Sequence, residues 1–215
     1  MVVRSVAHLN PRVGDAVLSV PQSAPLPQPV LAPLLVVIGC GNLNRSDDAA
    51  GVRVVQQLRA EFGSGLRADV RLFDAGTDGM QVMFQGRGAQ RLIIVDACRS
   101  ASDAGAIFCL PGSEIDTAHA PAYSLHSFRW DHAVHAGRRI FGAAFPSDLT
   151  VFLIEAGSLE LGLELTAAVG RAVDQVSQRI AQSIRDWGEA AQRHGHREGQ
   201  GPAPGPEPEP SAPPP

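Results

Sequence analysis

The segment VVIGCGNLNRSDDAAGVRVV, residues 36–55, decides the fold that we expect for this chain. It begins as a continuous apolar run and then passes through a Gly-Cys-Gly-Asn turn and two adjacent aspartates, Asp47 and Asp48. Valines then recur at helical spacing, at Val52 and Val55. A short apolar run is typical of a strand that is buried on both faces. The segment therefore predicts a buried strand, a polar loop and a helix.

The same alternation of strand and helix patterns continues along the chain. Apolar runs predict strands at 34–39, 70–76, 91–97, 105–110 and 149–156. Helical spacing predicts helices over 49–62, 78–86 and 124–142, and a long last helix with an apolar stripe of Val169, Val173, Val176, Ile180, Ile184 and Trp187. This order predicts an α/β fold, a three-layer α/β/α sandwich with a mostly parallel central sheet of about five strands.

The two ends of the chain differ in composition from its centre. Residues 1–32 are rich in proline and show no apolar periodicity, and residues 194–215 are rich in proline and glycine. Segments of this kind bury too little apolar surface to offset the entropy lost on folding. We therefore expect one domain over 33–193, with a disordered extension at each end.

Charge and composition argue against several classes of function. The formal net charge is -4 and no block of like charge occurs, which argues against binding to nucleic acid or to an anionic membrane. The first thirty residues contain no continuous apolar run with the length of a signal peptide core, and far less one with the length of a membrane span. All 18 basic residues are arginines, so Schiff-base chemistry and the lysine of a phosphate-binding P-loop are excluded.

The three cysteines indicate the compartment. Cys40, Cys98 and Cys109 are odd in number and lack C-x-x-C spacing, so we expect neither a disulfide framework nor a thiolate zinc site. A reducing cytoplasm is the compartment that fits. No apolar stripe is left unexplained by the predicted core, and we therefore expect a monomer.

Three groups of polar residues fall at or beyond the carboxyl ends of predicted strands. They are Asp47 with Asp48, Asp74, and His126. Ligands of open α/β sheets bind at this edge, so the three groups can converge on one site. Each carboxylate also has a structural explanation, because an aspartate before a helix caps its first N–H groups and Asp74 can satisfy the N–H groups of a tight turn. Spacing alone does not choose among the histidines of the predicted helix.

Other chemistries receive less support from the sequence. Gly39 and Gly41 match the start of the dinucleotide-binding fingerprint, but Asn44 replaces its third glycine. The acidic residue that ends the next strand, Asp74, comes well after the roughly 20 positions that are typical. A serine nucleophile lacks the G-x-S-x-G elbow. The apolar surroundings predicted for Cys98 fit a buried thiol better than a nucleophile.

Taken together and in order, these stretches closely resemble the hydrogenase maturation proteases, the endopeptidases that trim the large subunit of nickel–iron hydrogenases. VVIGCGNLNRSDD (36–48) matches the family's strand, its G-x-G-N turn and its acidic pair, and DAGT (74–77) stands for its D-G-G-T. RLIIVDA (91–97) matches its third strand, and SLH (124–126) its S-x-H motif. The resemblance covers about residues 34–187, nearly all of the chain that is expected to fold.

The resemblance implies a site that contacts nickel. In the family, an acidic residue of the first motif, the aspartate of the second and the histidine contact the metal, and the matching positions here are Asp48, Asp74 and His126. Two carboxylates and one imidazole leave coordination positions open for ligands from a partner. As the family is understood, the nickel is supplied by the precursor substrate and serves as the recognition element, and no organic cofactor is implied.

The implied function is that of a cytoplasmic endopeptidase of aspartic type. It would remove a carboxyl-terminal peptide from the nickel-loaded precursor of a NiFe-hydrogenase large subunit and so activate that enzyme, with Asp48, Asp74 and His126 as catalytic residues. A metal ion could activate the attacking water, or an aspartate could act as general base, and the sequence leaves both open. Two alternatives remain, a non-catalytic nickel-sensing assembly chaperone and, with less support, a Rossmann-like dinucleotide-binding enzyme.

Three positions depart from the family pattern. Ala75 replaces the first glycine of D-G-G-T, and alanine would strain the turn if this position needed a positive φ. Ala49 stands where glycine often follows the acidic pair, and Gly157 stands where proline is usual after the fifth strand. None of the three removes a residue expected to contact nickel.

Overall fold

The computed structural model describes residues 34–115 and 129–198, and both ends of the chain, with the predicted extension at 1–32, lie outside these ranges. The described strands are β1 (Leu35–Cys40), β2 (Val70–Gly76), β3 (Arg91–Cys98), β4 (Ile107–Pro111) and β5 (Asp148–Glu155). The described helices are α1 (Ala50–Phe62), α2 (Gly79–Gly86), α3 (Trp130–Phe141) and α4 (Ala167–Glu198), with short 3-10 turns at η1 (Ser46–Ala49), η2 (Gly63–Gly65) and η4 (Gly142–Ala144).

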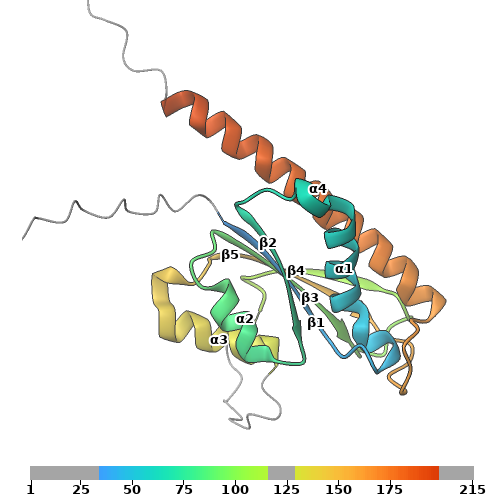
Figure 1. The fold of residues 1–215 in the computed structure, drawn as a ribbon. Helices are drawn as coiled ribbons and strands as arrows, with labels where there is room; N and C mark the ends of the chain where they lie inside the picture. Colours follow the sequence, from blue (N-terminus) through green and yellow to red (C-terminus); the bar gives the residue numbers. More distant parts are fainter. Residues whose placement is uncertain (1–33, 116–128, 199–215) are drawn as a thin grey trace, which may run out of the picture. The chain divides into compact units, whose positions relative to one another are not determined.

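The strands form one sheet in the order β2-β1-β3-β5-β4, in which β4 alone of these runs antiparallel to its neighbour (Figure 1). β1 lies between β2 and β3, and all six of its residues are buried, as the continuous apolar run predicted. Since β1, β2 and β3 are parallel, their carboxyl ends meet at the same edge. The α/β fold with a mostly parallel sheet is thus confirmed.

Helices cover both faces of the sheet, as Figure 1 shows. Side chains of successive strand residues point to opposite faces, so the two cores draw on alternate positions of β1. Leu35 and Val37 pack in the core under α1 and α4. Val36 and Ile38 pack in the second core, under α2 and α3. The three-layer arrangement follows from this double burial of the central strands.

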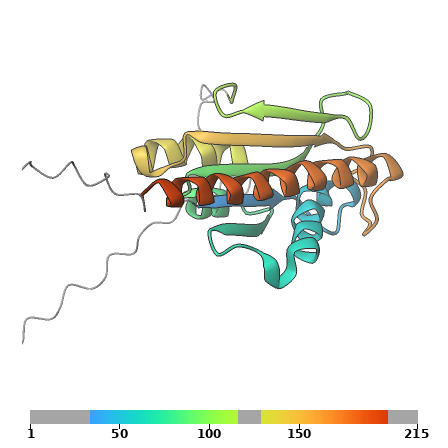
Figure 2. The same cartoon turned by 90° about the horizontal axis from the view of Figure 1, so that it is seen from above.

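The last helix, α4, keeps the apolar stripe that its spacing predicted. Five of the six predicted residues are buried against the sheet and α1, and Trp187 packs partly buried at the end of the stripe. Figure 2 shows α4 running alongside the strands. The helix extends to Glu198, past residue 193, where the sequence placed the end of the domain. Within the described ranges, no helix combines the length and apolar character needed to cross a bilayer.

The helix predicted over 124–142 begins later than expected. Arg129 has an extended backbone, with φ -83° and ψ 172°, and α3 starts at Trp130. Residues 124–128, which include His126, lie outside the described residues. Trp130, Ala133 and Val134 face the second core, so the described part of the predicted helix is amphipathic.

Candidate active site

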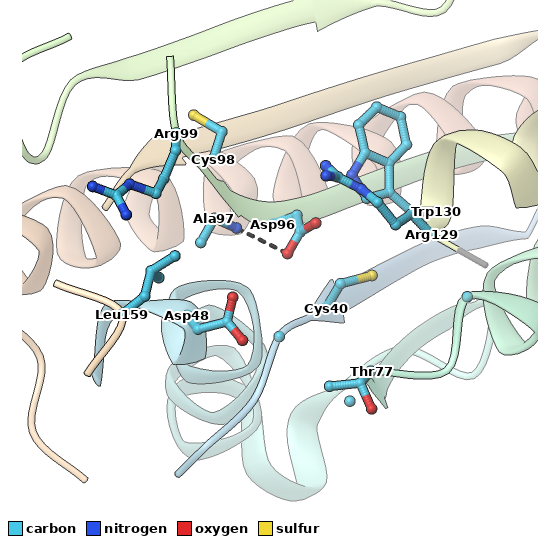
Figure 3. Close-up of a pocket in the computed structure, with 13 residues that line it drawn as sticks. Cys40, Asp48, Thr77, Asp96, Ala97, Cys98, Arg99, Arg129, Trp130 and Leu159 are labelled. Carbon is cyan, nitrogen blue, oxygen red and sulfur yellow. Dashed lines mark hydrogen bonds between the residues drawn. The ribbon is translucent and has the colours of Figure 1, made fainter. Parts of the chain in front are cut away.

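A cavity of about 510 Å³ opens at the carboxyl ends of the parallel strands. Its walls come from the ends of β1, β2 and β3, from η1, and from the starts of α2 and α3 (Figure 3). The lining residues are Cys40, Gly41, Asp48, Gly76, Thr77, Gly79, Asp96, Ala97, Cys98, Arg99, Arg129, Trp130 and Leu159. This is the edge at which open α/β sheets bind their ligands.

Two carboxylates line the cavity, Asp48 from η1 and Asp96 from β3. Both side chains are drawn in Figure 3. Asp48 Oδ2 accepts the backbone N–H of Asn42 at 3.2 Å, and Asp96 Oδ1 accepts the N–H of Ala97 at 2.9 Å. Each carboxylate has only one such bond to the described residues, so lone pairs remain that can face a ligand in the cavity.

The pKa of Asp96 is raised to about 7. Burial is the largest cause, because it disfavours the charged form, and the negative charge of Asp48 acts in the same direction. The Ala97 N–H and the positive charge of Arg129 act against it. A carboxyl group that titrates near neutrality can both accept and return a proton under working conditions.

This pKa predicts how stability depends on pH. The folded state holds the Asp96 proton up to about pH 7, whereas an unfolded chain releases it near pH 4, so the folded state binds more protons in this interval. The free energy of unfolding should therefore fall as pH rises through the interval, more steeply than in an Asp96→Asn variant. Urea unfolding of both proteins with a metal chelator present, at several pH values between about 4 and about 8, measures the difference. A difference that stays constant over this range would contradict the assignment.

Asp74 lies at the end of β2 but is not among the residues that line the cavity. Its Oδ1 accepts the N–H of Gly76 at 2.8 Å, as predicted for the carboxylate of a tight turn. The positive φ of this turn, 53°, falls on Gly76 and not on Ala75. Ala75 therefore brings no backbone strain to the turn, and its side chain is buried in the second core.

The cavity therefore brings Asp48 together with Asp96, a residue that the sequence analysis did not single out. Asp74 lies close enough to affect Cys40, a residue of the cavity wall. Its negative charge is the third cause of the raised pKa of the Cys40 thiol, after burial and the charge of Asp96. His126 is outside the described residues, so its position relative to these carboxylates is not given by the structure. One feature of the sequence could have identified Asp96 as a site residue, namely its place at the end of the apolar run RLIIVDA. An acidic residue in such a place is buried by the strands around it, and burial raises its pKa.

Asp47 has a different role from its neighbour. It is fully buried, and its carboxylate accepts the N–H groups of Gly157, Ser158 and Thr166 at 2.7 to 2.9 Å and the hydroxyl of Thr166 at 3.0 Å. Neither Asp47 nor Asp48 caps the helix that follows, so the predicted capping role was wrong. Asp47 instead ties η1 to the loop between β5 and α4. Gly157 can take part because, unlike proline, it has an N–H to donate.

The glycines of the opening turn permit close backbone packing. A Cβ on Gly41, whose φ is 130°, would meet the Asp48 carbonyl oxygen at 1.8 Å. A Cβ on Gly39 would meet the Gly51 carbonyl oxygen at 2.1 Å. The side of each glycine on which a Cβ would stand is thus filled by backbone, so close packing explains these glycines without a bound pyrophosphate.

The loop after β3 is held at the rim of the cavity by a buried carboxylate, that of Glu155. Its oxygens accept the backbone N–H of Ser100 at 2.9 Å, the Ser100 hydroxyl at 2.7 Å and the Cys98 thiol at 3.3 Å. The Ser100 hydrogen bonds hold the pKa of Glu155 below its usual value, whereas burial and the hydrogen bond to Glu155 raise the pKa of Cys98 to about 12. Cys98 is thus a protonated structural thiol, and Arg99 beside it is presented to the cavity.

Comparison with known proteins gives consistent results. A family model described as hydrogenase maturation protease matches residues 52–183. The hydrogenase 2 maturation protease of Escherichia coli K12 is 29% identical over 158 residues, which are 73% of this chain and 94% of the relative. The hydrogenase expression/formation protein HupD of Rhizobium leguminosarum bv. viciae is 27% identical over 164 residues, which are 75% of this chain and 79% of the relative.

Solved structures show the same likeness. The hydrogenase maturating endopeptidase HybD from E. coli superposes with a TM-score of 0.59 at 28% identity, over 72% of this chain and 94% of its own. The [NiFe] hydrogenase maturation protease HycI from Thermococcus kodakarensis KOD1 superposes with a TM-score of 0.56 at 21% identity, over 71% of this chain and 92% of its own. At that identity the second likeness concerns the fold alone.

Proposed function

Because this chain belongs to the hydrogenase maturation protease family and is therefore a hydrolase, we propose that it removes a carboxyl-terminal peptide from the precursor of a NiFe-hydrogenase large subunit. The nickel already inserted in the precursor serves as the recognition element. The observation that carries the proposal is the cavity at the sheet edge, where the Asp48 and Asp96 carboxylates face the same space.

The donor atoms of the cavity suit this role. Carboxylate oxygens bind divalent first-row metals, and two of them leave the remaining coordination positions to the precursor's own ligands. We propose Asp48 and Asp96 as the carboxylates that contact the metal, with His126 as a third donor. The lining of the cavity favours Asp96 over Asp74 for the second position. Asp74 then supports the site from the neighbouring turn through its bond to Gly76.

Peptide hydrolysis needs a group that takes a proton from the attacking water and returns it to the leaving amine. Asp96 can serve as this group through the carboxylate oxygen that does not contact the metal, and its pKa of about 7 describes the carboxyl group before the metal arrives. Asp48 would then hold the metal side of the substrate. Arg99 and Arg129, which also line the cavity, supply positive charge for the carbonyl oxygen as it becomes negative.

The test is the intact mass of a large-subunit precursor after incubation with this protein. Nickel-loaded precursor should lose a carboxyl-terminal peptide, and nickel-free precursor should keep its mass, because the unloaded form lacks the recognition element. An Asp48→Asn variant should leave both forms intact. Stable binding of the loaded precursor with no change of mass would favour the assembly-chaperone alternative, and cleavage of both forms alike would contradict nickel recognition.

The proposal places the reaction in the cytoplasm. The three cysteines are free thiols in the structure, and a reducing compartment keeps thiols in this form.

The Cys40 thiol is not part of the proposed donor set. It is buried, and its pKa is raised well above the usual thiol range by burial first and by Asp96 second, so it stays protonated beside the carboxylates. The donor set proposed for nickel is accordingly one of oxygen and nitrogen atoms.

A further inference from the structure

The loop between β5 and α4 exposes two large apolar side chains next to the cavity. Leu161 is 86% exposed and Leu163 is 62% exposed, and we call this pair the leucine rib. Single exposed leucines are ordinary on a protein surface. Here, however, two of them lie on one short segment, separated by Gly162 and flanked by the acidic residues Glu160 and Glu164.

The leucine rib is joined directly to the candidate active site. Leu159, two residues before Leu161, is part of the cavity wall, as Figure 3 shows. Four residues of chain span at most about 14 Å, so both leucines of the rib lie within that distance of Leu159. A peptide that extends from the cavity past Leu159 therefore comes within reach of the rib.

Backbone hydrogen bonds fix the position of the loop that carries the rib. Ser46 donates its N–H to the Gly162 carbonyl at 2.8 Å and its hydroxyl to the Glu164 carbonyl at 2.8 Å. Arg53 donates to the Leu163 carbonyl at 3.0 Å. The backbone carbonyl groups of the loop are thus hydrogen-bonded to η1 and α1, and the two leucine side chains are exposed to solvent. An apolar surface held rigid before binding loses little entropy when a partner covers it.

We propose that the leucine rib docks a segment of the large-subunit precursor next to the bond that is cut, and that this segment carries apolar side chains flanked by basic ones. The basic character follows from Glu160 and Glu164, which are exposed on either side of the rib and form no ion pair with a described residue. The nearby guanidinium groups of Arg45 and Arg53 are bound to the carbonyl groups of Leu159 and Leu163. The inference rests on the proposed function and adds the chemistry of the substrate segment.

The first experiment compares Leu161→Ser/Leu163→Ser with Ile140→Ser in the cleavage of nickel-loaded precursor. Ile140, on α3, is 64% exposed, a fraction similar to the 62% of Leu163. Its replacement therefore controls for the loss of exposed apolar surface away from the rib. The double variant should raise KM by about tenfold or more and change kcat by less than about twofold, since the rib contacts the substrate in both ground and transition states. Ile140→Ser should leave both constants unchanged.

The second experiment tests the charge of the docked segment. Glu160→Gln/Glu164→Gln should raise KM by roughly threefold to tenfold and make it less sensitive to salt, because acidic side chains steer a basic partner. A KM that is unchanged by this variant would overturn the basic character of the segment.

Two results would overturn docking at the rib. The first is a KM for Leu161→Ser/Leu163→Ser equal to that of the unmodified protein, and the second is an equal increase in KM for Ile140→Ser.

Failure of the proposed function has a different signature, which is that the unmodified protein binds the precursor but leaves its mass unchanged. The same variants are then compared by the Kd for the precursor, which should rise about tenfold for the double rib variant alone. No binding by the unmodified protein overturns both proposals.

Discussion

Replacement of Asp96 by asparagine should lower kcat/KM for precursor cleavage by roughly 10²–10⁴-fold, the range typical for loss of a general acid or base. Asparagine keeps the size of the side chain and can still accept the Ala97 N–H, but it can neither hold the proton nor bind a metal as a carboxylate does. The rate of peptide release from nickel-loaded precursor measures the effect, with thermal unfolding as a check that the variant folds.

The matched control is Asp74→Asn, at the end of the neighbouring strand. Asparagine there can still accept the Gly76 N–H, so the turn is kept, and Asp74 does not line the cavity. We therefore expect this variant to retain cleavage to within about tenfold of the unmodified protein. A larger loss in Asp74→Asn than in Asp96→Asn would instead support the pair that the family resemblance implied, Asp48 with Asp74.

Replacement of Asp47 by alanine should lower the free energy of unfolding by about 3–5 kcal/mol, the largest stability effect that we expect from a single substitution at this edge of the sheet. The change removes a fully buried carboxylate that accepts from three N–H groups and one hydroxyl, at Gly157, Ser158 and Thr166. The midpoint of urea unfolding, together with its slope, gives the value.

Asp148→Ala is the control for that measurement. Asp148 is also paired, with Arg91 at 2.7 Å, but its side chain is 47% exposed, and exposed ion pairs contribute about 0–1 kcal/mol. If both variants lost the same free energy of unfolding, the hydrogen bonds of Asp47 would stabilise the fold no more than an exposed ion pair does, which would contradict the prediction. Asp47→Asn should fall between them, because one amide oxygen still accepts while the amide nitrogen faces donors.

Local patterns were sufficient to predict most of the fold. The double burial of β1 and β3 follows from apolar runs, and the stripe of α4 follows from valines and isoleucines at helical spacing. The start of α3 was missed, because the apolar spacing of its helix continues upstream of Trp130 while the backbone of Arg129 is extended. The antiparallel pairing of β4 is a tertiary choice, set by contact with β5 rather than by the pattern of either strand.

The position of Asp48 at the edge of the sheet could be predicted, since a motif at the end of a buried strand has one natural position. The roles of Asp48, Asp74 and His126 stay predictions. Whether a carboxylate faces the cavity or its own turn depends on side-chain geometry, which separates Asp96 from Asp74 although both end a strand. The two adjacent aspartates divide in the same way, because only the buried one finds four donors on a loop 110 to 119 residues away.

The close approach of Gly51 has a consequence for how the site responds to its substrate. A Cβ there would meet the carbonyl oxygens of Val95 at 2.2 Å and Cys40 at 2.4 Å, so α1 rests on β1 and β3 backbone against backbone. Asp48 precedes this contact along the chain and Asp96 directly follows Val95. The backbone positions of the two aspartates are therefore set by main-chain packing, and only their side chains can readjust. If a substrate binds between these carboxylates as we propose, the backbone on either side should move little.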